Sequence, residues 1–99
     1  GMLEMMRLRD RKPPYEDPVP WAGEFVGKYL TSCVRACRMS NDPGLRAVTA
    51  RVMRELIRTQ AQDGYLGPFP DKHFMDRWDL WGHYHCMLAM AVGRSLAIV

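Results

Sequence analysis

The chain has few cysteines and no long hydrophobic run, and both shortages exclude classes of protein. Its 99 residues include three cysteines, an odd number that does not fit a disulfide framework. Cys33 and Cys37 lack the spacing of a zinc knuckle or a redox pair, so we expect buried free thiols and a cytoplasmic location. The longest apolar run, residues 86–99, has 14 residues and contains Arg94 and Ser95. A membrane-spanning helix needs about 18 apolar residues, so we expect no membrane partner.

The chain also lacks a block of basic residues. Its net charge is +3 and its isoelectric point is about 9.0, which would permit nucleic-acid binding. The 14 basic residues are spread along the chain and alternate with acids, unlike the clustered charge of a nucleic-acid interface. Glycine-rich phosphate loops, nucleophile elbows and strand patterns are missing as well. We therefore expect no nucleic-acid partner and an all-α fold.

The length allows one domain, which divides into an arm and a helical module. Four prolines occupy residues 13–20, where they remove backbone donors and force extended conformations. The sequence predicts an extended N-terminal arm over residues 1–20 and a helical module over residues 21–99.

Helical periodicity begins at Trp21 and predicts a helix of roughly four turns, which Ser40 to Gly44 end. Asp42 can cap the next helix and Pro43 can occupy its first position. This second helix is expected from about residue 44 to residue 62, before the loop that begins at Asp63. The residues expected to face inward on the first helix are Phe25, Val26, Tyr29, Leu30, Cys33, Val34 and Cys37. On the second helix they are Leu45, Val48, Val52, Met53, Leu56 and Ile57.

A third helix is expected from residues 77–79 to the C-terminus, since neither glycine nor proline stops it before Val99. It is apolar nearly all round, and two other helices cannot easily bury such a surface. We therefore expect a homo-oligomer that assembles through this C-terminal helix. The fold class is all-α, with a helical hairpin plus a third helix.

The densest chemistry lies in residues 78–86, Trp-Asp-Leu-Trp-Gly-His-Tyr-His-Cys. On a helix, Trp78, Trp81 and His85 share one face, and Asp79 can hydrogen-bond to His83. The two histidines diverge by about 200°, so we expect no metal and no cofactor. Two interpretations remain open: the aromatic residues belong to the core, or they line a cleft whose ring faces and polar groups suit a sugar.

Five segments resemble the N-terminal part of glycoside hydrolase family 127, the β-L-arabinofuranosidase family, in their order and approximate spacing. The resemblance covers nearly the whole chain from Met2 onward and implies the start of an (α/α)6 barrel of six helical hairpins. The segments are residues 3–5 (LEM), 21–30 (WAGEFVGKYL), 55–60 (ELIRTQ), 63–67 (DGYLG) and 78–87 (WDLWGHYHCM).

The resemblance implies that the loop and the third helix bind carbohydrate. The family's glutamate acid/base and its zinc-bound cysteine cluster, with the cysteine nucleophile, would lie beyond Val99, and none of the three cysteines here matches that cluster. We therefore expect a fragment of a glycoside-hydrolase-like protein with remnants of a carbohydrate cleft, no catalytic residues and no activity alone. The alternative is a non-enzymatic helical module for self-association or interaction. The substrate-binding residues that the resemblance implies are Asp63, Tyr65, Trp78, Trp81, His83 and His85.

Overall fold

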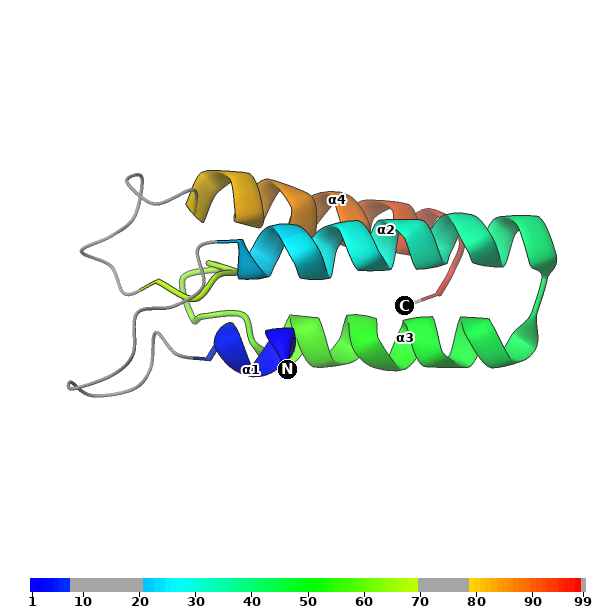
Figure 1. Cartoon of the computed structure of the whole chain (residues 1–99), viewed down its shortest axis with the longest axis horizontal. Helices are drawn as coiled ribbons and strands as arrows, with labels where there is room; N and C mark the ends of the chain where they lie inside the picture. The colour runs from blue at the N-terminus through cyan, green and yellow to red at the C-terminus, as the bar shows by residue number, and fades with distance from the viewer. Residues whose placement is uncertain (8–20, 70–78, 99) are drawn as a thin grey trace.

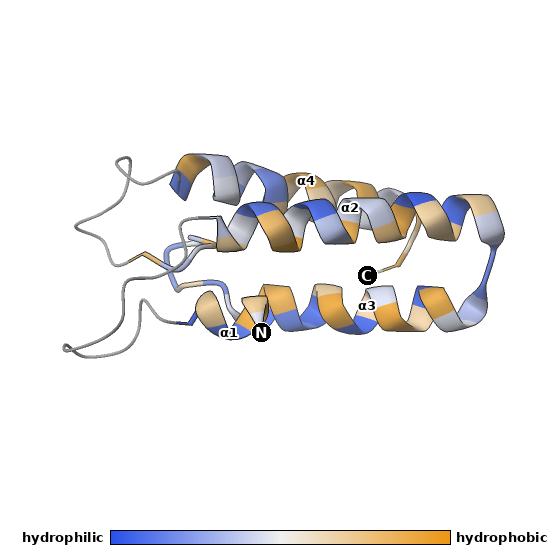
Figure 2. Cartoon of the chain, viewed as in Figure 1, coloured by the Kyte–Doolittle hydropathy of each residue, from blue (hydrophilic) through white to orange (hydrophobic). Residues whose placement is uncertain are grey.

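The computed structural model describes residues 1–7, 21–69 and 79–98, and these residues contain four helices and no strand (Figure 1). The all-α prediction is confirmed, and so is its arrangement of a hairpin, a loop and a further helix. Hydrophobic and hydrophilic residues alternate along the hairpin helices, as amphipathic helices require (Figure 2). The helices are α1 (Met2–Met5), α2 (Ala22–Ser40), α3 (Pro43–Arg58) and α4 (Asp79–Ser95).

The turn between α2 and α3 forms as its sequence predicts. Asn41 ends α2 in the left-handed region with φ +52°, a conformation that asparagine tolerates better than most residues. Asp42 then caps α3, because its Oδ1 accepts the backbone N–H groups of Gly44 at 2.8 Å and Leu45 at 3.1 Å. Pro43 occupies the first helical position, where its missing N–H costs nothing.

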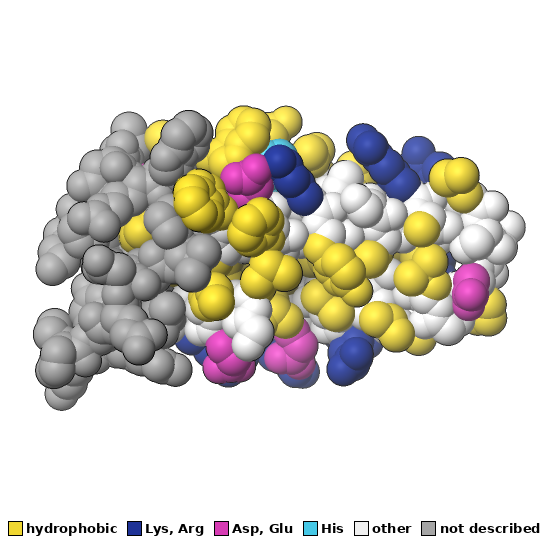
Figure 3. All heavy atoms as spheres, in the orientation of Figure 1, with side chains coloured by type: hydrophobic (Ala, Val, Ile, Leu, Met, Phe, Trp, Pro, Cys, Tyr) yellow, Lys and Arg dark blue, Asp and Glu magenta, His cyan; other side chains and the backbone are white. Residues whose placement is uncertain are grey.

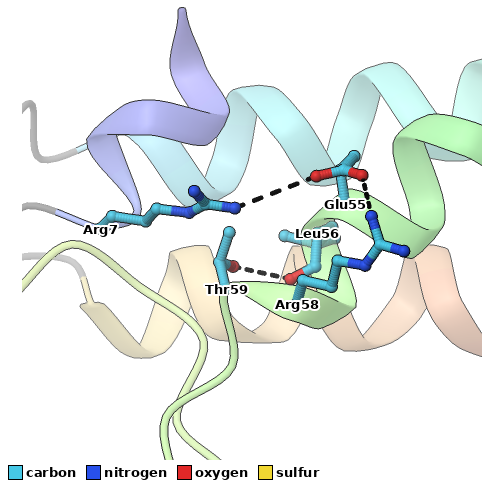
Figure 4. Close-up of polar contacts among 5 residues, drawn as sticks. All are labelled: Arg7, Glu55, Leu56, Arg58 and Thr59. Atoms are coloured by element: carbon cyan, nitrogen blue, oxygen red, sulfur yellow. Dashed lines mark hydrogen bonds and ion pairs between the residues drawn. The ribbon is translucent and has the colours of Figure 1, made fainter.

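The helix predicted over residues 44–62 is α3, and it ends at Arg58, so the prediction that it continues to residue 62 is wrong. The hydroxyl of Thr59 donates to the carbonyl oxygen of Leu56 at 2.7 Å, in competition with a further helical turn (Figure 4). A compact turn follows, in which Gln60 Nε2 donates to the carbonyl oxygen of Gly64 at 2.8 Å. Gly64 has φ +97°, a left-handed conformation that only glycine adopts without strain.

The last helix, α4, ends at Ser95 and does not continue to the C-terminus as predicted. The N–H of Ile98 donates to the carbonyl of Gly93, and the N–H of Ala97 donates to that of Arg94, which is the Schellman pattern. Ala97 takes the left-handed position with φ +54°, at a cost of about 1–2 kcal/mol. The reversal returns Ile98 to the core, where it is buried, and this burial offsets the cost.

The two long partners of α2 pack against it in different ways. The first, α3, is antiparallel to α2, as a hairpin requires, and the second, α4, is parallel to it (Figure 1). The α2–α4 interface is so close that a Cβ atom on Gly23 would stand 2.9 Å from the Cα of Gly82. A Cβ atom on Gly27 would stand 2.5 Å from the carbonyl oxygen of His85.

The core draws on the N-terminal residues and the 59–69 loop as well as on the helices. Met6 is fully buried, and the loop buries Leu66 and Phe69 completely. The prediction of an extended arm did not include α1, which forms within residues 1–7; residues 8–20 lie outside the described part. Arg7 follows α1 and lies 3.9 Å from Glu55 (Figure 4), which also pairs with Arg58.

Four residues predicted to face inward are instead exposed, namely Phe25, Tyr29, Val48 and Ile57. For Phe25 and Tyr29 the reason is the position of α4, which contacts the Gly23 and Gly27 side of α2 and so fixes which residues of α2 are buried. Phe25 and Tyr29 lie more than a quarter turn from that side and are each 48% exposed. The buried residues of α2 are Ala22, Gly23, Val26, Gly27, Leu30, Cys33, Val34 and Cys37.

Candidate functional site

The predicted substrate-binding residues separate into two groups in the structure. One group belongs to the loop that follows α3 and to the face of α4 beneath it, and the other lies at the α2–α4 interface. Trp78 lies outside the described residues. The first group is Asp63, Tyr65 and His83, and the second is Trp81 and His85.

His83 holds the loop against α4. Its Nδ1 accepts the backbone N–H of Leu66 at 3.1 Å, and the ring of Tyr65 stacks on its imidazole at 5.9 Å between centroids. Leu66 is fully buried directly beneath this contact. His83 therefore has a structural role in fixing the loop. The predicted hydrogen bond between Asp79 and His83 stays a prediction.

Asp63 shapes the turn at the start of the same loop. Its Oδ1 accepts the backbone N–H of Tyr65 at 3.0 Å, which is the short-range bond of an Asx turn. The side chain of Asp63 is exposed and lines a hollow of about 410 Å³ with Ala61 and Gln62. The hollow does not include Trp81 or His85, so the structure does not bring Asp63 together with the second group.

The second group forms an aromatic cluster on α4. The indole of Trp81 meets the imidazole of His85 edge to face, at 4.5 Å between centroids and 83° between planes. Tyr84 also packs edge to face on His85, at 5.1 Å, and stacks on Trp81 at 6.0 Å. Trp81 is 42% exposed and His85 is 8% exposed. Trp81 is therefore not buried with the core, although Lys28 lies over its ring and Tyr84 stacks on it.

An acidic and a basic residue of α2 lie beside this cluster, and the sequence analysis missed both. Lys28 Nζ donates to Glu24 Oε1 at 2.5 Å and lies 5.8 Å from the centroid of the Trp81 ring. The hydrogen bond from Lys28 lowers the pKa of Glu24; the indole of Trp81 lowers it further, and desolvation opposes both. Glu24 is therefore ionised near neutral pH. The sequence signal for this pair was its i, i+4 spacing on a helix.

A pocket of about 280 Å³ opens between α2 and α4 next to the aromatic cluster. Among the described residues, two of its buried polar atoms have no hydrogen-bond partner: His85 Nε2 and Thr31 Oγ1. Near the upper edge of Figure 3, hydrophobic side chains lie together with an acidic and a basic one. The pocket is lined by Lys28, Thr31, Ser32, Arg35, His85 and Leu88.

The three cysteines are free and buried, as expected for Cys33 and Cys37. Cys86 Sγ donates to the carbonyl oxygen of Gly23 at 3.4 Å, and burial raises the pKa of this thiol to about 12. Such a thiol is not a nucleophile at neutral pH. Within the described ranges, no three histidine, cysteine or acidic side chains are grouped closely enough to hold a metal ion. None of the helices described is both long and apolar enough to span a bilayer.

Comparison with known proteins gives one match. The family model for "Beta-L-arabinofuranosidase, GH127 catalytic domain" matches residues 5–94, which include α2, α3 and nearly all of α4. No curated protein and no solved structure matches the chain. The match spans both groups of site residues and most of the all-α fold, in agreement with the resemblance found in the sequence. The chain therefore belongs to the glycoside hydrolase family 127 catalytic-domain family.

Proposed function

We propose that the chain is a glycoside-hydrolase-like module that binds carbohydrate through the face formed by Trp81. The observation that carries the proposal is the half-exposed indole of Trp81 with the Glu24–Lys28 ion pair at its edge. A sugar ring has apolar C–H faces and polar hydroxyls, so it is recognised by a flat aromatic surface with hydrogen-bonding groups at its edge. Membership of the family supports a sugar as the ligand.

The proposal includes His85 as a second contact and leaves His83 and Asp63 as residues that shape the loop after α3. The ring of His85 contacts both Trp81 and Tyr84, so its orientation is fixed before a ligand arrives. His83 and Asp63 form the loop through contacts with the backbone of Leu66 and Tyr65.

Titration with methyl β-L-arabinofuranoside tests the carbohydrate proposal. The expected result is a shift of the Trp81 indole N–H resonance on binding, and a loss of affinity of at least tenfold in Trp81→Leu. Trp21→Leu is the matched control, because Trp21 is exposed to a similar degree at the N-terminal end of α2. Equal losses in the two variants, or no binding by the unsubstituted chain, would contradict the proposal.

We expect binding without hydrolysis from this chain alone. Hydrolysis normally needs one carboxyl group that is protonated to act as an acid, and a second that acts as a base or nucleophile. Glu24 is the carboxylate beside Trp81, and its lowered pKa is the opposite of what a general acid requires. An assay with aryl arabinofuranosides and arabinopyranosides should show no turnover. Turnover that disappears in Glu24→Gln would contradict this expectation.

A second candidate function is self-association through α4. Leu80, Tyr84 and Met87 are 57%, 50% and 47% exposed and follow one another at helical spacing along the outer face of α4. Sedimentation at micromolar concentration should then give a mass of at least twice 11.4 kDa. A monomer, or an oligomer unaffected by Met87→Glu, would contradict self-association through this face.

A cytoplasmic location is also part of the proposal. It is supported by the three unpaired thiols, which a reducing compartment preserves. Detection of the protein outside the cytoplasm by cell fractionation would contradict it.

A further inference from the structure

We propose that the pocket between α2 and α4 binds an oxyanion, and that this oxyanion is the carboxylate of an acidic sugar. The inference rests on the proposed carbohydrate function and names the class of sugar. The pocket is lined by two cations of α2, Lys28 and Arg35, and by the hydroxyl-bearing residues Thr31 and Ser32 between them. All four lie on one side of the helix, because their spacing is i, i+3, i+4 and i+7.

The charges around the pocket do not cancel among the described residues. Lys28 is paired with Glu24, and this pair is neutral as a unit. Arg35 is exposed, lines the pocket and forms no ion pair with another described residue. One positive charge therefore remains, on a guanidinium group whose planar fork matches a carboxylate.

Two buried polar atoms point to a missing ligand. His85 is more than nine-tenths buried, and its Nε2 has no hydrogen-bond partner among the described residues. The hydroxyl of Thr31 is buried and unpartnered in the same way. Threonine within a helix commonly bonds to the carbonyl four residues earlier, as Thr49 does to Leu45 at 2.8 Å. Thr31 makes no such bond, although the residue lines the pocket.

The size and neighbours of the pocket favour an anionic group attached to a sugar. Its volume of about 280 Å³ is close to the lower end of small-molecule sites, about 300 Å³. His85 joins the pocket to the aromatic cluster, because its ring is also in edge-to-face contact with Trp81. A carboxylate beside Arg35, Thr31 and His85 would thus place the sugar ring toward the exposed part of Trp81.

Calorimetric titration at constant ionic strength tests the inference with three probes: glucuronate, glucose and inorganic sulfate. We expect glucuronate to bind about tenfold more tightly than glucose, which is the effect of one charged hydrogen bond. Arg35→Gln should reduce glucuronate affinity to the level of glucose. Arg38→Gln is the matched control, because it removes the same charge from the exposed last turn of α2 outside the pocket, and it should change nothing.

A second variant, Thr31→Val, and the indole N–H resonance of Trp81 distinguish the possible outcomes of the titration. Thr31→Val should weaken glucuronate binding at least threefold without affecting glucose, and glucuronate should shift the Trp81 indole resonance. Equal affinities for glucose and glucuronate would overturn the inference and leave the carbohydrate proposal standing. Absence of binding by either sugar, with methyl β-L-arabinofuranoside still bound, would overturn the inference and leave the carbohydrate proposal standing. Sulfate binding that depends on Arg35, without binding of glucuronate, would overturn the sugar as the source of the anion.

Discussion

The two interfaces of α2 differ in what separates the helices. At the α2–α4 interface the backbones themselves are in contact, since Gly23 and Gly27 leave no space for a side chain. At the α2–α3 interface the helices are held apart by side chains such as Met53 and Leu56, both buried. We therefore expect larger side chains to destabilise the α2–α4 interface and smaller side chains to destabilise the α2–α3 interface.

The difference also determines where each interface leaves open space. Beside the α2–α3 interface a mainly apolar groove of about 240 Å³ forms where α1 meets the helices, lined by Gly1, Met2, Leu3, Val26, Tyr29 and Val52. Beside the α2–α4 interface the open space is polar and contains the unpartnered atoms of Thr31 and His85. We therefore expect the close contact of α2 with α4 to keep the polar pocket in place. The side chains around the apolar groove can rearrange when one of them is substituted.

The largest expected effect is that of Gly27→Ala. The added Cβ would stand 2.5 Å from the carbonyl oxygen of His85, which is backbone and cannot move alone. We expect a loss of more than about 3 kcal/mol in the free energy of unfolding, measured by urea denaturation. Gly44→Ala is the control: its Cβ would meet only the side chain of Asp42, and the change should stay within about 1 kcal/mol. Equal effects would mean that the α2–α4 interface is not as close as described.

Leu56→Ala probes the α2–α3 interface in the opposite way. Leu56 is fully buried, so its truncation leaves a cavity and should cost about 2–3 kcal/mol. The lower half of the usual range is expected because the neighbouring groove allows α3 to move inward. Ile57→Ala, at a position 37% exposed, should cost less than about 1 kcal/mol in the same denaturation experiment. A larger cost for Ile57 would reverse the assignment of the buried face.

His83→Ala separates the structural histidine from the one that faces the pocket. The substitution leaves the N–H of Leu66 without its acceptor and should cost about 1–2 kcal/mol. His83→Asn, whose amide oxygen can accept the same hydrogen bond, should recover part of this loss. Hydrogen exchange of the Leu66 amide provides the direct measurement. Unchanged exchange in His83→Ala would show that the loop is held by other contacts.

Thr31→Val should raise stability, and it is the smallest effect of the four. Replacement of a buried, unpartnered hydroxyl by a methyl group removes a desolvation cost, so we expect a gain of about 0.5–1 kcal/mol. Thr49→Val should instead lower stability, because Thr49 is hydrogen-bonded to Leu45 and lies 3.7 Å from the thiol of Cys37. Thermal denaturation of the pair compares the two directly. A loss of stability in Thr31→Val would mean that its hydroxyl has a partner in the native protein.

Much of the fold could be predicted from local sequence, because local contacts decide it. The cap at Asp42 and the proline at position 43 set the start of α3 through bonds that span two or three residues. The helix ends at Arg58 and Ser95 could not be predicted in this way. One depends on a competing threonine hydroxyl, and the other on the burial of Ile98 against distant residues.

The sequence by itself determined the helix class, the order of the three long helices and the family, since periodicity and motif order are properties of neighbouring residues. It also placed Trp81 and His85 on one face of a helix, four residues apart. Only the tertiary structure decided that His83 faces the loop while His85 faces α2. The reason is physical: the parallel contact of α2 with α4 places Lys28 and Arg35 beside a histidine that is fifty or more residues away in the chain. No pattern of neighbouring residues in the sequence indicates that these residues lie close together in the fold.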